Sequence, residues 1–269
     1  MANPGEGAFV AEWEALEAGL RRPDQETEAW SRAQLGGDVA HFANAYHIAR
    51  RALVCLEQVL TVSPWDDPVT RQYRAVQLQT EFAFRRLLNA WGLLLQGYHF
   101  DARGLQRVAW EAVNRAGYYI LNEGTGEEFL NNHEHYESKV RNFLSGKGRD
   151  MFPERWKVTG DVLTQQWNNL SPYLHTYKLG ALIIQADLNG EQLTLTPFGV
   201  RKRDELYFSF YLDVFMMLRL AGVLSRSAIH LMGEWPADLS QQLDRSEQDR
   251  RQLDERIRQE FSDRFEEVR

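Results

Sequence analysis

The chain has 269 residues, 43% of them hydrophobic, which is enough for a packed core in one large domain or two small ones. It contains 19 glycines, 8 prolines and one cysteine, Cys55, so the composition excludes collagen, low-complexity disorder, an intrachain disulfide and a cysteine-based zinc site within one copy. A formal net charge of −7 argues against binding to nucleic acid or anionic lipid by charge alone.

The sequence does not indicate export or a membrane span. Residues 1–7 are small and polar and lack the basic and apolar regions of a signal peptide. The most apolar segment, 206–224, is interrupted by Ser209, Asp213 and Arg219, which favours a core helix over a transmembrane one. We therefore expect a cytoplasmic protein with no membrane partner.

Apolar residues recur at spacings of three and four along most of the chain, which is the period of an α-helix. The helices predicted before the β-hairpin cover residues 8–22, 28–62, 68–98, 101–121, 126–145 and 156–170. Asp67 is expected to cap the third of these helices, with Pro68 in its first turn. The connector between the helices over 68–98 and 101–121 is short, so these two helices must be antiparallel.

The pattern changes to strands after Gly180. Residues 181–196 contain two strand-like runs joined by Asn189 and Gly190, a dipeptide typical of two-residue hairpin turns. A helix over 202–232 follows, and then a highly charged helix after Pro236.

These elements predict an all-α, multi-helix bundle with one small inserted β-hairpin. The bundle is expected over 1–235, with the hairpin near 181–196. The charged C-terminal helix over 236–269 either packs against its own chain or contacts a partner or a second copy.

Motifs for nucleotides, metals and nucleophilic catalysis are missing from the sequence. It has no phosphate-binding P-loop, no nucleophile elbow and no His-Glu-x-x-His motif. His133 and His135 point about 200° apart on a helix, so they cannot share a metal. We expect neither a metal nor another cofactor.

Two polar groups stand out. Arg107, Glu111 and Asn114 lie on nearly one side of a predicted helix that is otherwise apolar, where they form either an ion pair that sets helix register or part of a site. The second group, before the hairpin, is Leu170-Ser-Pro-Tyr-Leu-His175, whose histidine either orients the chain or performs acid–base chemistry.

At these residues the chain resembles a group of bacterial helical proteins related to the HEPN superfamily (higher eukaryotes and prokaryotes nucleotide-binding). The resemblance covers about residues 80–225 and rests on an R-x-x-x-E-A helix, an L-S-x-Y-x-H segment and a β-hairpin. Its residues here are Arg107, Glu111, Ala112, Leu170, Ser171, Tyr173, His175, Asn189, Gly190 and Pro197.

The resemblance implies a helical bundle of the kind met in phage defence, some of whose relatives cleave RNA without a metal. In such an enzyme an arginine holds the scissile phosphate and a histidine transfers protons. The chain departs from the HEPN ribonucleases, which place an Arg and a His on one helix with four to six residues between them. Arg226 and His230, with three residues between them, come closest.

The favoured hypothesis is a HEPN-like component of a bacterial defence or stress system that acts as an interaction or ligand-sensing module, with RNA or a nucleotide as a candidate ligand. The alternatives are a metal-independent endoribonuclease and a structural homodimer built on the C-terminal helix. Candidate catalytic residues are Arg107, Glu111 and His175. Candidate binding residues are Asn114, Ser171, Tyr173 and Tyr118.

Overall fold

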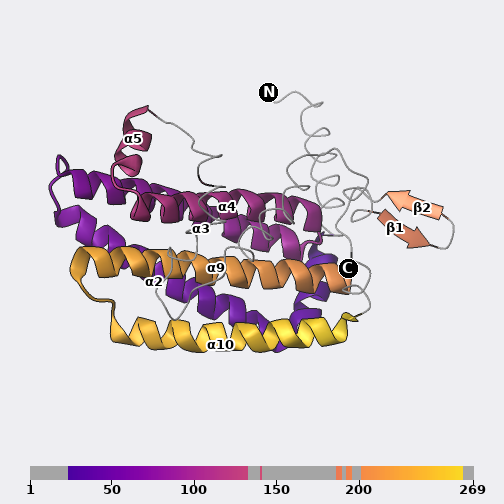
Figure 1. The fold of residues 1–269 in the computed structure, drawn as a ribbon. Helices are drawn as coiled ribbons and strands as arrows, with labels where there is room; N and C mark the ends of the chain where they lie inside the picture. The colour runs from indigo at the N-terminus through magenta and orange to yellow at the C-terminus, as the bar shows by residue number, and fades with distance from the viewer. Residues whose placement is uncertain (1–23, 133–139, 141–185, 190–191, 196–200, 263–269) are drawn as a thin grey trace, which may run out of the picture.

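The computed structural model describes residues 24–132, 140, 186–189, 192–195 and 201–262 (Figure 1). The chain is all-α in class, as the helical spacing predicts. Residues 24–35 are helical. The elements that follow are η1 (Gly36–Asp38), α2 (Val39–Val62), α3 (Pro68–Leu95), α4 (His99–Leu121), α5 (Thr125–Asn132), β1 (Ala186–Asn189), β2 (Gln192–Leu195), α9 (Arg203–Met232) and α10 (Ala237–Glu260).

The prediction of one continuous helix over 28–62 is wrong at a single point. The chain leaves the α-helix for a 3-10 turn over Gly36–Asp38 and resumes it in α2. Gly36 has a φ of +50°, a left-handed conformation that side chains other than glycine rarely adopt. The Gly36-Gly37 pair, which the helical spacing alone does not register, is therefore where the helix is interrupted.

The start of α3 is the one predicted. The Asp67 carboxylate accepts hydrogen bonds from the Thr70 backbone N–H at 2.7 Å and from the Thr70 hydroxyl at 2.8 Å, and Pro68 is the first residue of the helix. This cap satisfies one of the free N–H groups at the helix start. Helix α3 ends at Leu95, earlier than predicted, because Gly97 turns the chain with a φ of +82°.

Helices α3 and α4 pack side by side along most of their length (Figure 1). Since only three residues connect them, they are antiparallel, as predicted.

Helix α9 lies at the centre of the bundle and contacts α2, α3, α4 and α10. It is apolar on nearly all sides, which is typical of a helix that is surrounded by others. By length and composition alone α9 could cross a membrane, but 83% of its most apolar window is buried within the described part of the protein. This burial is what the sequence predicts of a core helix.

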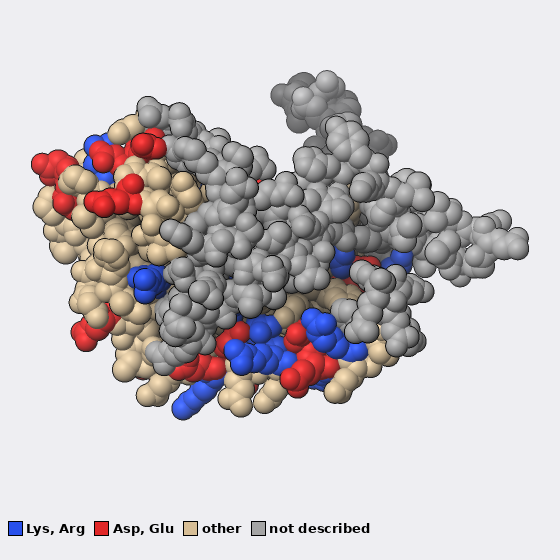
Figure 2. All heavy atoms as spheres, in the orientation of Figure 1, with Lys and Arg blue, Asp and Glu red and all other residues tan. Residues whose placement is uncertain are grey.

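The C-terminal helix α10 packs on α2 and α9 through an apolar stripe. The buried residues of this stripe are Leu239, Leu243, Leu253 and Ile257. Ion pairs of 2.7 Å between Arg51 and Asp238 and of 2.6 Å between Asp38 and Arg256 fasten α10 to α2 and to the turn that precedes it. The stripe thus packs against its own chain, and acidic and basic side chains alternate along the outer side of the helix (Figure 2).

The two short strands pair antiparallel, with Ala186 opposite Leu195 and Asn189 opposite Gln192. Residues 190–191, which carry part of the predicted turn, lie outside the described residues. So do the helices predicted over 8–22 and 156–170 and nearly all of the one predicted over 126–145 beyond Asn132.

Candidate functional site

Helix α4 carries the polar residues that the sequence singles out. The Arg107 guanidinium lies 2.6 Å from a Glu111 carboxylate oxygen, and the other oxygen lies 3.6 Å from Arg115. Asn114 and Tyr118 continue the same side of the helix, because residues three and four apart lie on one face. We call Arg107, Glu111, Asn114 and Tyr118 the α4 polar strip.

The α4 polar strip is mostly enclosed. The Arg107 side chain is only 4% exposed and that of Glu111 13%, so the pair operates with little water around it. A buried pair of this kind is poor evidence of stability, since removing two charges from water offsets most of their attraction. In the described residues the Arg107 charge is already balanced by Glu111, so Arg107 would have to leave its partner before it could clamp a phosphate.

Asn114 is the most unusual member of the strip. Its side chain is fully buried, and neither its amide nitrogen nor its amide oxygen has a hydrogen-bond partner among the described residues. A buried amide without partners costs about 1–3 kcal/mol, so such groups are rare and call for a functional or structural reason.

A second buried polar group joins α4 to α9 beside the strip. The Gln106 side-chain amide donates to the Ser209 backbone carbonyl and to the Asp213 carboxyl, both at 2.9 Å. Burial raises the pKa of Asp213 well above its ordinary value, while the Gln106 hydrogen bond lowers it in part. The second Asp213 oxygen and the Gln106 amide oxygen have no partner in the described part of the chain.

Arg103 extends this polar contact toward the start of α9. Its guanidinium pairs with Glu205 and donates to the Ser209 hydroxyl at 3.1 Å. Four polar residues of α4 and α9, Arg103, Gln106, Ser209 and Asp213, are therefore linked in one chain of contacts. Such contacts fix the register of the two helices, because each works only at one relative position along the helix axes.

The positions of the remaining predicted site residues relative to the strip are not described. Ser171, Tyr173 and His175 lie outside the described residues, so the convergence of His175 with Arg107 stays a prediction. Within the described ranges no group of three or more His, Cys, Asp or Glu side chains is placed to hold a metal ion.

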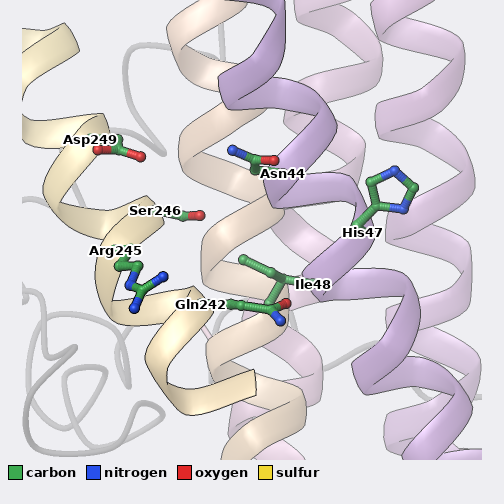
Figure 3. A pocket seen from close by; sticks show the side chains of 7 residues that line it. All are labelled: Asn44, His47, Ile48, Gln242, Arg245, Ser246 and Asp249. Atoms are coloured by element: carbon green, nitrogen blue, oxygen red, sulfur yellow. The ribbon is translucent and has the colours of Figure 1, made fainter. Parts of the chain in front are cut away.

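A surface hollow of about 250 Å³ lies between α2 and α10, and sequence reasoning did not find it (Figure 3). Its lining residues are Asn44, His47, Ile48, Gln242, Arg245, Ser246 and Asp249. Most of these side chains are exposed, and the hollow is open to solvent. No sequence pattern relates the two helices across nearly 200 residues, so only the fold brings them together.

The sequence analysis assigns no role to Gln106 and treats Asp213 only as an interruption of an apolar segment. The signal that could have indicated this contact is Asp213 itself, a carboxyl in the middle of a helix that is otherwise apolar. Such a group must be paired, hydrogen-bonded or neutral when it is buried.

No family model, curated protein or solved structure matches this chain. The resemblance to the HEPN superfamily therefore rests on the short motifs alone.

Proposed function

We propose that this chain is a HEPN-like helical bundle with an inserted β-hairpin that acts as a ligand-sensing or interaction module of a bacterial cytoplasmic defence or stress system. The α4 polar strip is its binding face, and a nucleotide or an RNA nucleotide unit is its ligand. The observation that carries the proposal is Asn114, a fully buried amide with both polar atoms free among the described residues.

An amide suits this role because it offers both a donor and an acceptor, which is the pattern presented by the edge of a nucleobase. Tyr118 supplies an aromatic ring on the same side of α4, and an aromatic ring is a surface on which a base stacks. The Arg107–Glu111 pair next to them provides charge that a ligand can reorganise when it binds.

The same pair argues for binding over catalysis. A ribonuclease needs a cation that is free to stabilise the charge that develops on the phosphate. Here Glu111 holds Arg107 at 2.6 Å with little exposure to solvent. The endoribonuclease with Arg107 and His175 is therefore the second candidate, and the homodimer on the C-terminal helix is the third, because the apolar stripe of α10 is used within the chain.

The test is thermal unfolding of the full chain with a panel of nucleoside mono-, di- and triphosphates. A ligand that binds the folded state raises the unfolding temperature, and Asn114→Leu should abolish the rise. The same substitution at Asn89, an exposed residue of α3, is the matched control and should keep it. If no nucleotide raises the unfolding temperature, or if Asn114→Leu keeps the full rise, the proposal is wrong.

The enzyme alternative is tested on a denaturing gel of tRNA and mixed cellular RNA incubated with the protein in EDTA. Cleavage by the wild type that disappears in His175→Ala would place the ribonuclease first. We expect intact RNA in both lanes.

A further inference from the structure

The last turns of α9 carry an arginine that has no acidic partner among the described residues. Arg226 is partly buried, and its Nε atom is fully buried without a hydrogen-bond partner. It forms no ion pair with any described carboxylate. This nitrogen has lost hydration that no described group replaces.

Two further donors lie next to Arg226. His230 follows it by one helical turn, and the His230 ring lies 5.6 Å from the ring of Tyr73 on α3, measured between centroids. Tyr73 is only 2% exposed. Burial raises the pKa of Tyr73 to about 12, while the charge of Arg226 acts to lower it, so the phenol keeps its proton and Arg226 lies near it.

The stretches of α9 and α3 that carry these three residues contain no acidic side chain. Helix α9 has no Asp or Glu from residue 214 to its end at Met232, and α3 has none from Pro68 to residue 80. Helix dipoles contribute little here, because the positive start of α3 and the negative end of α9 lie near each other and act in opposite directions. The charge of the side chains, and not the helix dipoles, therefore determines which ligand binds beside Arg226.

We propose that Arg226, His230 and Tyr73 form a binding site for a phosphate-class oxyanion, carried either by a free phosphate or by a small phosphate monoester. All three groups present N–H or O–H donors, and a guanidinium binds two oxygens of one anion at once. A tetrahedral phosphate directs its oxygens toward donors on several sides, whereas a planar carboxylate directs both of its oxygens toward a guanidinium that binds it with two hydrogen bonds.

This site is separate from the α4 polar strip. The two sites share no residue, because the strip lies on α4 alone, whereas Arg226 and His230 lie on α9 and Tyr73 lies on α3. The inference therefore does not depend on the function proposed for Asn114, and the two can fail separately.

The test is isothermal titration of the full chain with inorganic phosphate, with acetate at equal ionic strength as the comparison anion. We expect saturable binding of phosphate that is tighter than that of acetate. Arg226→Gln should weaken phosphate binding about tenfold or more, the effect of losing one charge-assisted hydrogen bond. Adenosine monophosphate, titrated into Asn114→Leu so that the α4 polar strip does not contribute, separates the two sources. Tighter binding than that of free phosphate assigns the site to a monoester, and weaker binding assigns it to free phosphate.

Four further variants keep the test decisive. Tyr73→Phe and His230→Phe each remove one donor without removing the arginine, and each should weaken binding even if Arg226→Gln unfolds the protein. Arg85→Gln, which removes an exposed arginine on α3, is the charge-matched control and should leave the affinity unchanged. Asn114→Leu should also leave it unchanged. Absence of saturable phosphate binding, or equal weakening by Arg226→Gln and Arg85→Gln, would overturn the proposal.

Discussion

Gln106 on α4 and Asp213 on α9 are joined by a hydrogen bond of 2.9 Å between the Gln106 amide nitrogen and an Asp213 carboxyl oxygen, and both side chains are fully buried. The amide donor favours the ionised carboxylate, but burial acts more strongly and favours the neutral acid. The contact at the centre of the bundle is therefore sensitive to pH, although it lies far from water.

The sign of this sensitivity follows from proton binding. The pKa of Asp213 is raised in the folded state, so above the ordinary value of 3.8 the folded chain holds a proton that the unfolded chain has lost. Its contribution to the free energy of unfolding is therefore present at low pH and falls as the pH rises. We expect Asp213→Asn to remove this loss, because the amide is neutral at every pH and still accepts from Gln106.

Urea unfolding at about pH 5 and about pH 8 measures this effect. The wild type should lose more stability than Asp213→Asn between the two values. Asp238→Asn is the control, because the Arg51 hydrogen bond lowers the pKa of the exposed Asp238 below its ordinary value of 3.8. Asp238 is therefore ionised at both pH values, and its substitution should leave the pH dependence between them unchanged. Equal pH dependence in wild type and Asp213→Asn would contradict the assignment.

The sequence predicts the helices well because their signals are local. The Asp67 cap, the α3–α4 connector and the start of α9 all depend on residues close together in the chain, and they lie at or near the expected positions. The spacing of apolar residues does not predict the interruption at Gly36, because that spacing is a property of many residues and one glycine hardly changes it. The Arg107–Glu111 pair was visible for the same local reason, as its members are one turn apart.

The contacts between distant segments could not be predicted in this way. Gln106 meets Asp213 across more than 100 residues, and Tyr73 meets His230 across more than 150. No pattern within a single sequence indicates which turn of one helix faces which turn of another. The relevant signal is indirect, namely a polar residue such as Asp213 within an apolar segment, which shows that a partner is needed but not which one.

The ion network between α9 and α10 should be the most costly contact to break. Arg219 and Arg250 both pair with Glu247, and all three side chains are largely buried. Burial alone would raise the pKa of Glu247, but the two guanidinium groups hold it below its usual value. Glu247→Gln removes the carboxylate that two buried cations share and should destabilise the fold by about 3–5 kcal/mol.

Urea unfolding of Glu247→Gln against Glu57→Gln measures this loss. Glu57 is exposed on α2 and forms no ion pair with a described residue, so its substitution should change stability very little. Adding Arg219→Met to Glu247→Gln should restore part of the loss, because it removes one uncompensated charge. Similar stability of the two single variants would contradict this account.

Asn114→Leu should separate stability from binding. Because the Asn114 amide is buried without partners in the described part of the chain, an apolar side chain of similar size should raise the free energy of unfolding by about 1 kcal/mol. The same variant is expected to lose the nucleotide response. Urea unfolding without ligand tests the first effect, and destabilisation by the variant would show that the amide has a partner that holds the fold.

The last prediction concerns Gly126, the second residue of α5, which lies against α3. A Cβ atom there would lie 2.8 Å from both the backbone and the side-chain oxygens of Gln72. The Gln72 side chain is not free to move, because it accepts from the Gly126 N–H at 2.9 Å and donates to the Asn122 carbonyl at 3.0 Å. Gly126→Ala should therefore destabilise the protein by about 1–3 kcal/mol, as overpacking does.

Gly92 in α3 is the matched control, since a Cβ atom there meets nothing within 4 Å. Alanine is the better helix former, so Gly92→Ala should stabilise the protein by about 0.5–1 kcal/mol. The two substitutions are chemically identical and should shift the urea midpoint in opposite directions. A shift of the same sign in both would mean that helix propensity, and not the close approach of α5 to Gln72, decides the outcome at Gly126.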